Sequence, residues 1–215
     1  MANFALAFDM DGVIADTNPA HKKALQKFLS QYDISLDDEF LKRELYGTPN
    51  KEWIPKVFKD IDQDTLKKYA EEKEAIFREI YGNELEALPG LFDFLKEMQE
   101  KEVKCCVATS APKANLDFII DGLEIREYFD IFLCDENFEK GKPDPEIYLL
   151  SARQMDIQNQ NCIVLEDSLS GITSGKAAGS PVVGFKTTHS CEEMDQADLC
   201  VNDFSNLNFD TLKKL

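Results

Sequence analysis

The distribution of hydrophobic residues divides the chain into two kinds of segment. Residues 4–8, FALAF, form a short continuous apolar run, and five further runs of this kind lie between residues 103 and 201. Such runs predict strands that are buried on both faces, as in a parallel sheet. Residues 18–83 contain no convincing strand, and their apolar residues recur at the three- and four-residue spacing of helices.

After residue 88 the predicted strands alternate with helices. The strands lie in the segments VKCCVAT, DIFLC, NCIVLED, PVVGF and ADLCV. The segments LPGLFDFLKEMQEK, PKANLDFIIDGL, DPEIYLLSARQM and LSGITSGKAAG have helical spacing. This alternation is typical of a parallel sheet with helices on both faces. We therefore predict an α/β fold with a Rossmann-like parallel sheet.

The helical segment interrupts the α/β pattern, because the strand at residues 4–8 resembles the later strands in character. We therefore predict a core domain made of residues 1–16 and 86–215. Residues 17–85 are predicted to form a smaller helical domain inserted between the two parts. Pro55 lies in this insertion and is expected near a helix break or kink.

Two aspartates follow the first predicted strand, Asp9 and Asp11, and Gly12 comes directly after them. Taken alone, this pattern is also compatible with ordinary turn chemistry. However, open parallel sheets bind their ligands beyond the carboxyl ends of the strands. The two carboxylates are therefore candidate site residues.

Polar residues also follow the other predicted strands. Thr109 and Ser110 follow the second strand, Lys142 lies in GKPDP after the third, and Glu166 and Asp167 end the fourth. Each has an ordinary explanation: the hydroxyls or the acidic pair could cap the next helix, and the lysine could be exposed. Their joint placement at one edge of the sheet predicts a functional site there.

The acidic residues at this edge favour a magnesium ion, which takes oxygen ligands from one or two carboxylates, waters and phosphate. A calcium-binding EF-hand loop is excluded, because positions six and twelve counted from Asp9 are Ile14 and Ala20 instead of glycine and glutamate. Zinc is disfavoured because these strand ends carry no cysteine or histidine.

A cation, a lysine and hydroxyl groups beside a carboxylate form a receptor for a phosphoryl group. Asp9 could act as the nucleophile and form an aspartyl-phosphate. Asp11 could protonate the leaving group and later deprotonate water. Thr109, Ser110 and Lys142 are predicted to hold the phosphoryl oxygens.

Four segments in this order, FDMDG, VATS, GKPDP and LEDSLSGITSGKAAG, resemble the motifs of the haloacid dehalogenase-like superfamily. The sequence is most similar to the β-phosphoglucomutase and phosphoglycolate phosphatase subgroup. The resemblance implies a sheet in the order 5-4-1-2-3 and a helical cap domain inserted after the first motif. It also implies a magnesium site formed by Asp9, Asp11 through its backbone carbonyl, and Asp167, with Glu166 beside it in a supporting role.

The cap segment LYGTPNKEW matches the subgroup less well. The mutase typically has a lysine just before the cap glycine and an arginine three residues after it. Around Gly47 these places hold Tyr46 and Asn50, which favours hydrolysis. Lys51 could contact a second phosphate, although the segment could also be a plain helix–helix turn with Asn50 as a cap. His21 is equally compatible with packing and with substrate binding.

We therefore expect a Mg²⁺-dependent phosphatase that acts on a small phosphorylated metabolite such as a sugar phosphate. The alternative is a phosphotransferase of the β-phosphoglucomutase type. A 2-haloacid dehalogenase is less favoured because such enzymes usually lack the second aspartate, which is present here as Asp11. A non-catalytic binding protein is disfavoured because all the core motif residues are present.

The composition restricts partners and location. The net charge of −17 argues against nucleic acid and acidic lipid surfaces as partners. We expect neither a signal peptide nor a membrane span, because the first apolar run is interrupted early and no run approaches about 20 residues. The pattern does not indicate an oligomeric state.

Five of the six cysteines lie in apolar runs: Cys105, Cys106, Cys134, Cys162 and Cys200. They are predicted to be buried reduced thiols, and reduced thiols suggest the cytoplasm.

Overall fold

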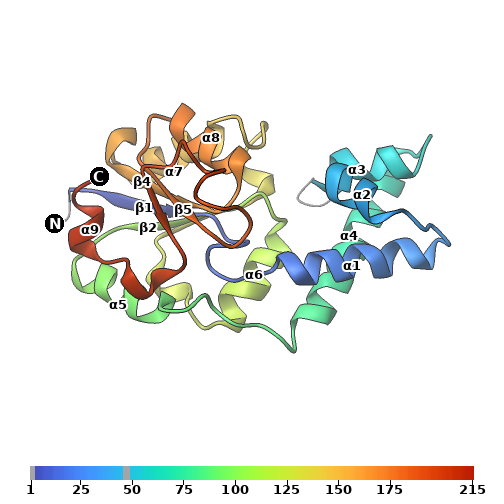
Figure 1. The fold of residues 1–215 in the computed structure, drawn as a ribbon, viewed down its shortest axis with the longest axis horizontal. Helices are drawn as coiled ribbons and strands as arrows, with labels where there is room; N and C mark the ends of the chain where they lie inside the picture. Colours follow the sequence, from blue (N-terminus) through green and yellow to red (C-terminus); the bar gives the residue numbers. More distant parts are fainter. Residues whose placement is uncertain (1–2, 46–48) are drawn as a thin grey trace. The chain divides into compact units, whose positions relative to one another are not determined.

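The computed structural model describes residues 3–45 and 49–215, and the chain divides into two compact units. Unit 1 consists of Met1–Asp16 and Leu85–Leu215, and unit 2 consists of Thr17–Glu84 (Figure 1). The chain therefore leaves unit 1 shortly after its first strand and returns to it before the second.

Unit 1 is built on a six-stranded parallel sheet in the order β3-β2-β1-β4-β5-β6. This confirms the predicted α/β fold, with β6 added beyond the five strands of the expected order. In the register of the sheet, Phe8 of β1 lies opposite Val107 of β2 and Leu165 of β4. The first strand is therefore central. The strands are β1 (Ala5–Phe8), β2 (Cys105–Ala108), β3 (Ile131–Leu133), β4 (Cys162–Glu166), β5 (Val182–Phe185) and β6 (Leu199–Val201).

Helices cover both faces of the sheet, with α7 and α8 on one face and α5 on the other (Figure 1). The small side chains Ala5 and Ala7 belong to the apolar cluster that contains Tyr148 of α7. On the opposite face, the ring of Phe8 lies 6.2 Å from that of Phe94 in α5. Burying a side chain such as Phe8 contributes about 1.5–3 kcal/mol to stability. The helices of unit 1 are α5 (Leu91–Glu100), α6 (Lys113–Gly122), α7 (Glu146–Gln154), α8 (Leu169–Ala177) and α9 (Phe209–Leu212).

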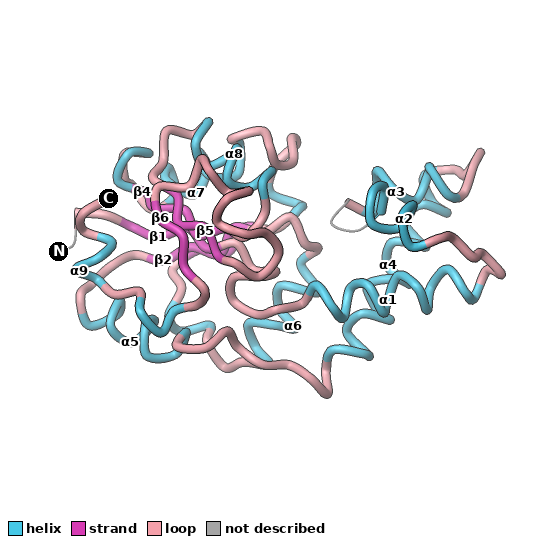
Figure 2. Tube along the Cα trace, in the orientation of Figure 1, coloured by secondary structure: helices cyan, strands magenta, loops and turns pink. Residues whose placement is uncertain are grey.

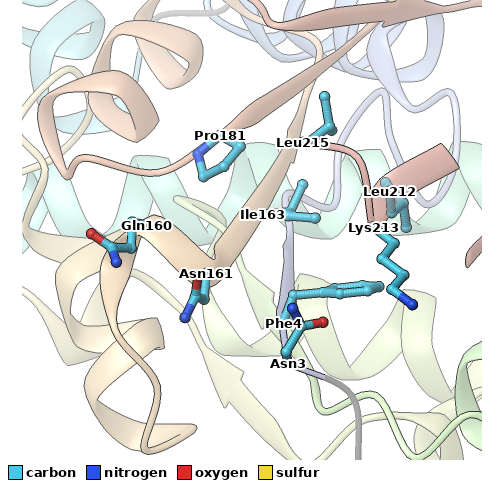
Figure 3. Close-up of a pocket in the computed structure, with 9 residues that line it drawn as sticks. All are labelled: Asn3, Phe4, Gln160, Asn161, Ile163, Pro181, Leu212, Lys213 and Leu215. Carbon is cyan, nitrogen blue, oxygen red and sulfur yellow. The ribbon is translucent and has the colours of Figure 1, made fainter. Parts of the chain in front are cut away.

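The two ends of the sheet differ in character. Figure 2 shows loops gathered where the parallel strands end, which is the edge that carries the predicted site residues. A small pocket lies at the opposite end and is lined by residues such as Phe4, Asn161 and Pro181, which directly precede β1, β4 and β5 (Figure 3). Because all strands run in the same direction, this pocket is remote from the predicted chemistry.

Unit 2 is helical, and α1 packs along α4. The ring of Phe28 in α1 contacts the rings of Trp53, Phe58 and Tyr69 at 5.8 to 6.0 Å between centroids. Trp53 is buried in this aromatic core. Pro55 lies inside α3, which ends at Val57. The elements of unit 2 are α1 (Asn18–Gln31), α2 (Asp38–Phe40), a π-helical turn (Leu41–Leu45), α3 (Asn50–Val57) and α4 (Gln63–Tyr81).

The cysteines follow the prediction with one exception. Four of them are buried free thiols, namely Cys105, Cys106, Cys134 and Cys162. The prediction for Cys200 is wrong, because it forms a disulfide with Cys191. Cys200 lies on the edge strand β6, and the connection from β5 brings Cys191 back beside it. The cytoplasmic location stays a prediction, and one of the five thiols on which it was based is not reduced in the structure.

Within the described ranges 3–45 and 49–215, no helix combines the length and the hydrophobicity needed to cross a bilayer.

Candidate active site

Asp9 occupies the centre of the predicted edge. It directly follows β1, and its backbone N–H donates to the carbonyl oxygen of Leu165 at 2.9 Å, so the adjacent strand fixes its position. Only 8% of Asp9 is exposed. Burial raises the pKa of Asp9 well above its ordinary value, and the attraction of Lys142 opposes this rise.

Lys142 is the cation of the site, and 7% of its side chain is exposed. Its ammonium group donates to Oδ1 of Asp9 at 2.6 Å, to Oε1 of Glu166 at 2.6 Å and to the carbonyl oxygen of Ala108 at 3.2 Å. These three acceptors match the three hydrogens of an ammonium group. Burial lowers the pKa of Lys142, but the charges of Asp9 and Glu166 outweigh it and raise the pKa above its usual value.

Glu166 is fully buried and engages both of its carboxylate oxygens. Oε1 accepts from Lys142 at 2.6 Å and from the hydroxyl of Tyr148 at 2.7 Å. Oε2 accepts from the backbone N–H groups of Asp167 and Ser168 and from the Ser168 hydroxyl. Burial raises the pKa of Glu166, but the charge of Lys142 and these hydrogen bonds outweigh it, so the pKa lies below its usual value. A Cβ on Gly171 would lie 1.8 Å from Oε1, so only glycine fits there.

Asp167 directly follows β4 and is also buried. Its Oδ2 accepts a hydrogen bond from the hydroxyl of Thr188, and the hydroxyl of Thr187 lies 3.3 Å from the same oxygen. Burial, together with the charge of Glu166, raises the pKa of Asp167 to about 7. Without a further cation, this carboxylate is therefore held in an environment that disfavours its charge.

Gly12 allows the first motif to approach Asp167 closely. Its φ is +78°, in the left-handed region, and a Cβ at this position would lie 2.0 Å from Oδ2 of Asp167. Glycine is therefore needed both for the backbone conformation and for the space.

We predict that Gly12→Ala lowers activity and divalent-cation affinity by about tenfold or more, because the added methyl group displaces Asp167. The matched control is Gly179→Ala, whose φ is +81° and whose added Cβ would meet no atom within 4 Å. Both variants should lose about 1–2 kcal/mol of folding stability from backbone strain. Isothermal titration with Mg²⁺ separates the two effects, and an equal loss of affinity in both variants would argue against the role of the close contact.

The structure also places the remaining predicted core residues. Thr109 is buried at the end of β2, and its hydroxyl accepts from the backbone N–H of Ala111 at 3.0 Å. Ser110 is exposed. Asp11 is half-buried, and its charge contributes to the raised pKa of both Asp9 and Asp167. The edge therefore carries hydroxyl and carboxylate groups around Asp9.

The acidic groups fit a divalent cation. Among the described residues, Asp9, Glu166 and Asp167 offer carboxylate oxygens that all lie within 4.8 Å of one another. Lys142 supplies one positive charge against these three acids, so the cluster has an excess of negative charge whenever all three are ionised. An all-oxygen donor set of this kind suits Mg²⁺. Since both oxygens of Glu166 are engaged by other groups, Asp9 and Asp167 are the better candidates for direct ligands.

Three contributors to this site were missed in the sequence. Tyr148 lies in a helix, where an aromatic residue predicts packing and gives no sign of its hydroxyl's bond to Glu166. Thr187 and Thr188 follow β5, so the rule that polar residues after parallel strands reach one edge could have identified them.

In unit 2, His21 and Asn50 belong to one polar cluster. The Lys73 ammonium group donates to Nδ1 of His21 at 2.9 Å and to Oε1 of Glu74 at 2.8 Å. Asn50 donates to Oε1 of Glu74 at 2.7 Å and accepts from the indole N–H of Trp53 at 2.9 Å. Asn50 therefore has a structural role that ties α3 to α4.

His21 is packed as well as hydrogen-bonded, since its ring stacks on Phe77 at 3.7 Å between centroids. Lys51 is exposed. Gly47 lies outside the described residues. Of the four predicted substrate contacts, the structure thus brings His21 and Asn50 to one cluster around Lys73 and Glu74.

Comparison with known proteins finds relatives that cover most of the chain. The family model described as haloacid dehalogenase-like hydrolase matches residues 6–185. The chain is 33% identical over 180 residues to a phosphorylated carbohydrates phosphatase of Thermotoga maritima, with 81% of each chain covered. It is 33% identical over 181 residues to the fructose-1-phosphate phosphatase YqaB of Escherichia coli, covering 83% of this chain and 94% of the relative.

Two further similarities span nearly the whole chain. A β-phosphoglucomutase of Bacillus subtilis is 30% identical over 216 residues, which cover 97% of this chain and 93% of the relative. The crystal structure of a HAD hydrolase, family IA, variant 3, from Entamoeba histolytica has a TM-score of 0.89 at 27% identity and covers 99% of this chain and 100% of that chain. These matches confirm the predicted subgroup resemblance: the chain belongs to the haloacid dehalogenase-like hydrolase family.

Proposed function

We propose that this phosphohydrolase is a Mg²⁺-dependent phosphatase of phosphorylated carbohydrates that works through an aspartyl-phosphate on Asp9. The observation that carries the proposal is the position of Asp9 at the end of the central strand. There, Lys142 joins it to the buried Glu166, and the carboxylate of Asp167 lies within 4.8 Å. A rigid, desolvated carboxylate beside a cation is suited to nucleophilic attack on phosphorus.

In the first step, a carboxylate oxygen of Asp9 forms a bond to phosphorus, and the bond from phosphorus to the sugar oxygen breaks. Asp11 gives its proton to the departing oxygen. In the second step, Asp11 takes a proton from water as the water oxygen attacks phosphorus. The bond from phosphorus to the Asp9 oxygen breaks, which releases inorganic phosphate and restores the Asp9 carboxylate. Lys142 holds Oδ1 of Asp9 throughout, which limits rotation of the nucleophilic carboxylate.

Asp9, Asp167 and the backbone carbonyl of Asp11 are the groups that would hold Mg²⁺. When bound, the ion supplies positive charge that lets an anionic phosphate approach the acidic cluster. Glu166 supports the site indirectly, because it accepts hydrogen bonds from Lys142 and from the backbone N–H of Asp167. Thr109 and Ser110 supply hydroxyl and N–H groups for the phosphoryl oxygens, and the charge of Lys142 adds to this attraction.

The substrate class follows from the two phosphatase relatives, which are named for phosphorylated carbohydrates and fructose 1-phosphate. Such ligands carry hydroxyl groups, and we propose that His21 and Lys51, together with Gly47, contribute to their recognition from the cap domain. Asn50 supports this region through its bonds to Glu74 and Trp53. Neither nucleic acid nor a membrane is a proposed partner, consistent with the net charge of −17.

The alternative function is a β-phosphoglucomutase-type phosphotransferase, favoured by the similarity to the Bacillus subtilis enzyme. It would need a cationic group for the second phosphate of a bisphosphate. Asn50 stands where the mutase pattern has arginine, and its side chain is engaged within unit 2. Hydrolysis is therefore the preferred function.

The test is phosphate release from a panel of sugar phosphates. We expect release with Mg²⁺, loss of at least about 100-fold in EDTA because the acidic cluster then repels phosphate, and recovery when Mg²⁺ is restored. Activity that survives EDTA would refute the metal dependence. Isomerised sugar phosphate formed only with a bisphosphate primer, without free phosphate, would support the mutase instead.

A further inference from the structure

The connection between β5 and β6 carries a turn that is fastened at both ends. At its start, the backbone N–H of Lys186 donates to the carbonyl oxygen of Val201 at 3.0 Å. At its end, Cys191 is bonded to Cys200. Both Val201 and Cys200 belong to β6. Residues 187–190 therefore form a short turn held on the edge strand, and we call this segment the β5–β6 turn.

The β5–β6 turn presents two hydroxyl groups to the acidic edge. The Thr187 hydroxyl lies 2.6 Å from the carbonyl oxygen of Gly12 and 3.3 Å from Oδ2 of Asp167. A hydroxyl has one hydrogen to donate, so the shorter contact with Gly12 takes it. The Thr188 hydroxyl donates to Oδ2 of Asp167. The turn is thus linked both to the first motif and to the acid at the end of β4.

We propose that Thr187 and Thr188 are positioning residues for the divalent-cation site, and that the Cys191–Cys200 disulfide holds the turn that carries them. The inference rests on the proposed function, in which Asp167 is a metal ligand. A hydrogen bond to one oxygen of a ligating carboxylate fixes its rotation, and loss of such a partner typically weakens metal binding 10- to 100-fold.

The position of the turn supports this role over simple packing. Asp167 is buried, whereas Thr187 is half-buried and Thr188 is exposed, so the hydroxyls cover the carboxylate from the solvent side. An exposed threonine adds little to folding stability. Oδ2 of Asp167 also lies so close to Gly12 that a Cβ there would be 2.0 Å away, so this oxygen is held in a confined place between Gly12 and the two threonines.

The first experiment compares three forms by isothermal titration with Mg²⁺ alone, without substrate or thiol reductant. The double variant Thr187→Val/Thr188→Val removes both hydroxyls and keeps the shape of the side chains. The double variant Thr187→Ser/Thr188→Ser keeps both hydroxyls. We expect about tenfold weaker Mg²⁺ binding in the valine variant, near wild-type binding in the serine variant, and similar melting temperatures for all forms in EDTA.

The second experiment tests the disulfide by a double-mutant cycle. Cys191→Ser/Cys200→Ser is expected to weaken Mg²⁺ binding about threefold, because the turn is then fastened at one end only. If the disulfide acts through the two threonines, the same change made in the valine variant should have no further effect. Thr173→Val on the exposed side of α8 serves as the control substitution and should bind Mg²⁺ normally.

The possible failures can be told apart. Unchanged Mg²⁺ affinity in the valine variant, with wild-type binding that is lost in Asp167→Asn, would overturn this inference and leave the proposed function intact. Wild-type protein that binds no Mg²⁺ in an Asp167-dependent way would overturn both. Additive losses in the cycle would refute the part assigned to the disulfide.

Discussion

Asp9→Asn is expected to lower phosphate release by about 10⁴-fold or more, because the amide cannot form the acyl-phosphate bond. The fold should survive this change. Burial and the nearby charges of Glu166, Asp11 and Asp167 disfavour the ionised form of Asp9, so a neutral isostere removes an electrostatic cost. We therefore expect the melting temperature of Asp9→Asn in EDTA to equal or exceed that of the wild type.

The measurement combines steady-state phosphate release with thermal unfolding in EDTA. Asp93→Asn is the matched control, because it makes the same chemical change at an exposed position on α5 and should keep full activity. Phosphate release by Asp9→Asn at a wild-type rate would refute the covalent mechanism. Loss of activity together with a large fall in melting temperature would instead indicate a structural role for Asp9.

The core of the site could be predicted because it depends on one geometric rule. In a parallel sheet, the residues that follow each strand meet at the same edge, so apolar runs ending in Asp9, Thr109 and Glu166–Asp167 identify that edge. Lys142 was harder to place, because it follows β3 only after a long loop and a lysine is usually exposed. The resemblance of GKPDP to a family motif identified Lys142, whereas the hydrophobic pattern alone did not.

The rest depends on contacts that do not follow from periodicity. Tyr148 contributes through a hydroxyl at the end of a buried ring, and its sequence context is that of any packed aromatic residue. The Cys191–Cys200 pair was missed because apolar neighbours around Cys200 indicated a buried strand, whereas β6 is an edge strand onto which the preceding connection folds. Tertiary packing decides both features: a helix packed on the sheet in the first case, and a connection folded onto an edge strand in the second.

Gly12 and Gly171 show that the motifs contain residues needed for steric reasons as well as residues needed for chemistry. Gly12 leaves room for Asp167, and Gly171 leaves room for Glu166, with prospective Cβ contacts of 2.0 Å and 1.8 Å respectively. The acidic side chains of Glu166, at the end of β4, and of Asp167, which follows it, therefore each require a glycine from another segment. Residues from motifs far apart in the sequence therefore pack together around the carboxylates.

Lys142→Met should lower activity by about 10²–10³-fold, because it removes a preorganised positive charge from the reacting carboxylate. It should also destabilise the protein, since Asp9 and the fully buried Glu166 lose their common counter-ion. Removing one partner of a buried ion pair costs about 3–5 kcal/mol. The protein can reduce this cost only by protonating a carboxylate.

The destabilisation should therefore depend on pH in a defined direction. In the wild type, the pKa of Glu166 lies below its usual value, so its contribution to stability is present at pH 5 to 8 and is lost only as the pH falls further. The pKa of Asp9 is already raised in the wild type against the attraction of Lys142, so removing Lys142 raises it further. The pKa of Glu166 then also rises above its unfolded value through burial, and the variant loses more stability than the wild type as the pH rises. The gap in melting temperature between wild type and Lys142→Met should be larger at pH 8 than at pH 5.

Thermal unfolding in EDTA at the two pH values measures this gap without interference from bound metal. Lys140→Met is the matched control, because the Lys140 side chain is 72% exposed and lies only 3.8 Å from the partly exposed Asp144. Such a surface pair contributes at most about 1 kcal/mol, so the control should unfold like the wild type at both pH values. An equal gap at pH 5 and pH 8 for Lys142→Met would mean that Lys142 acts by packing and does not serve as the counter-ion of the two acids.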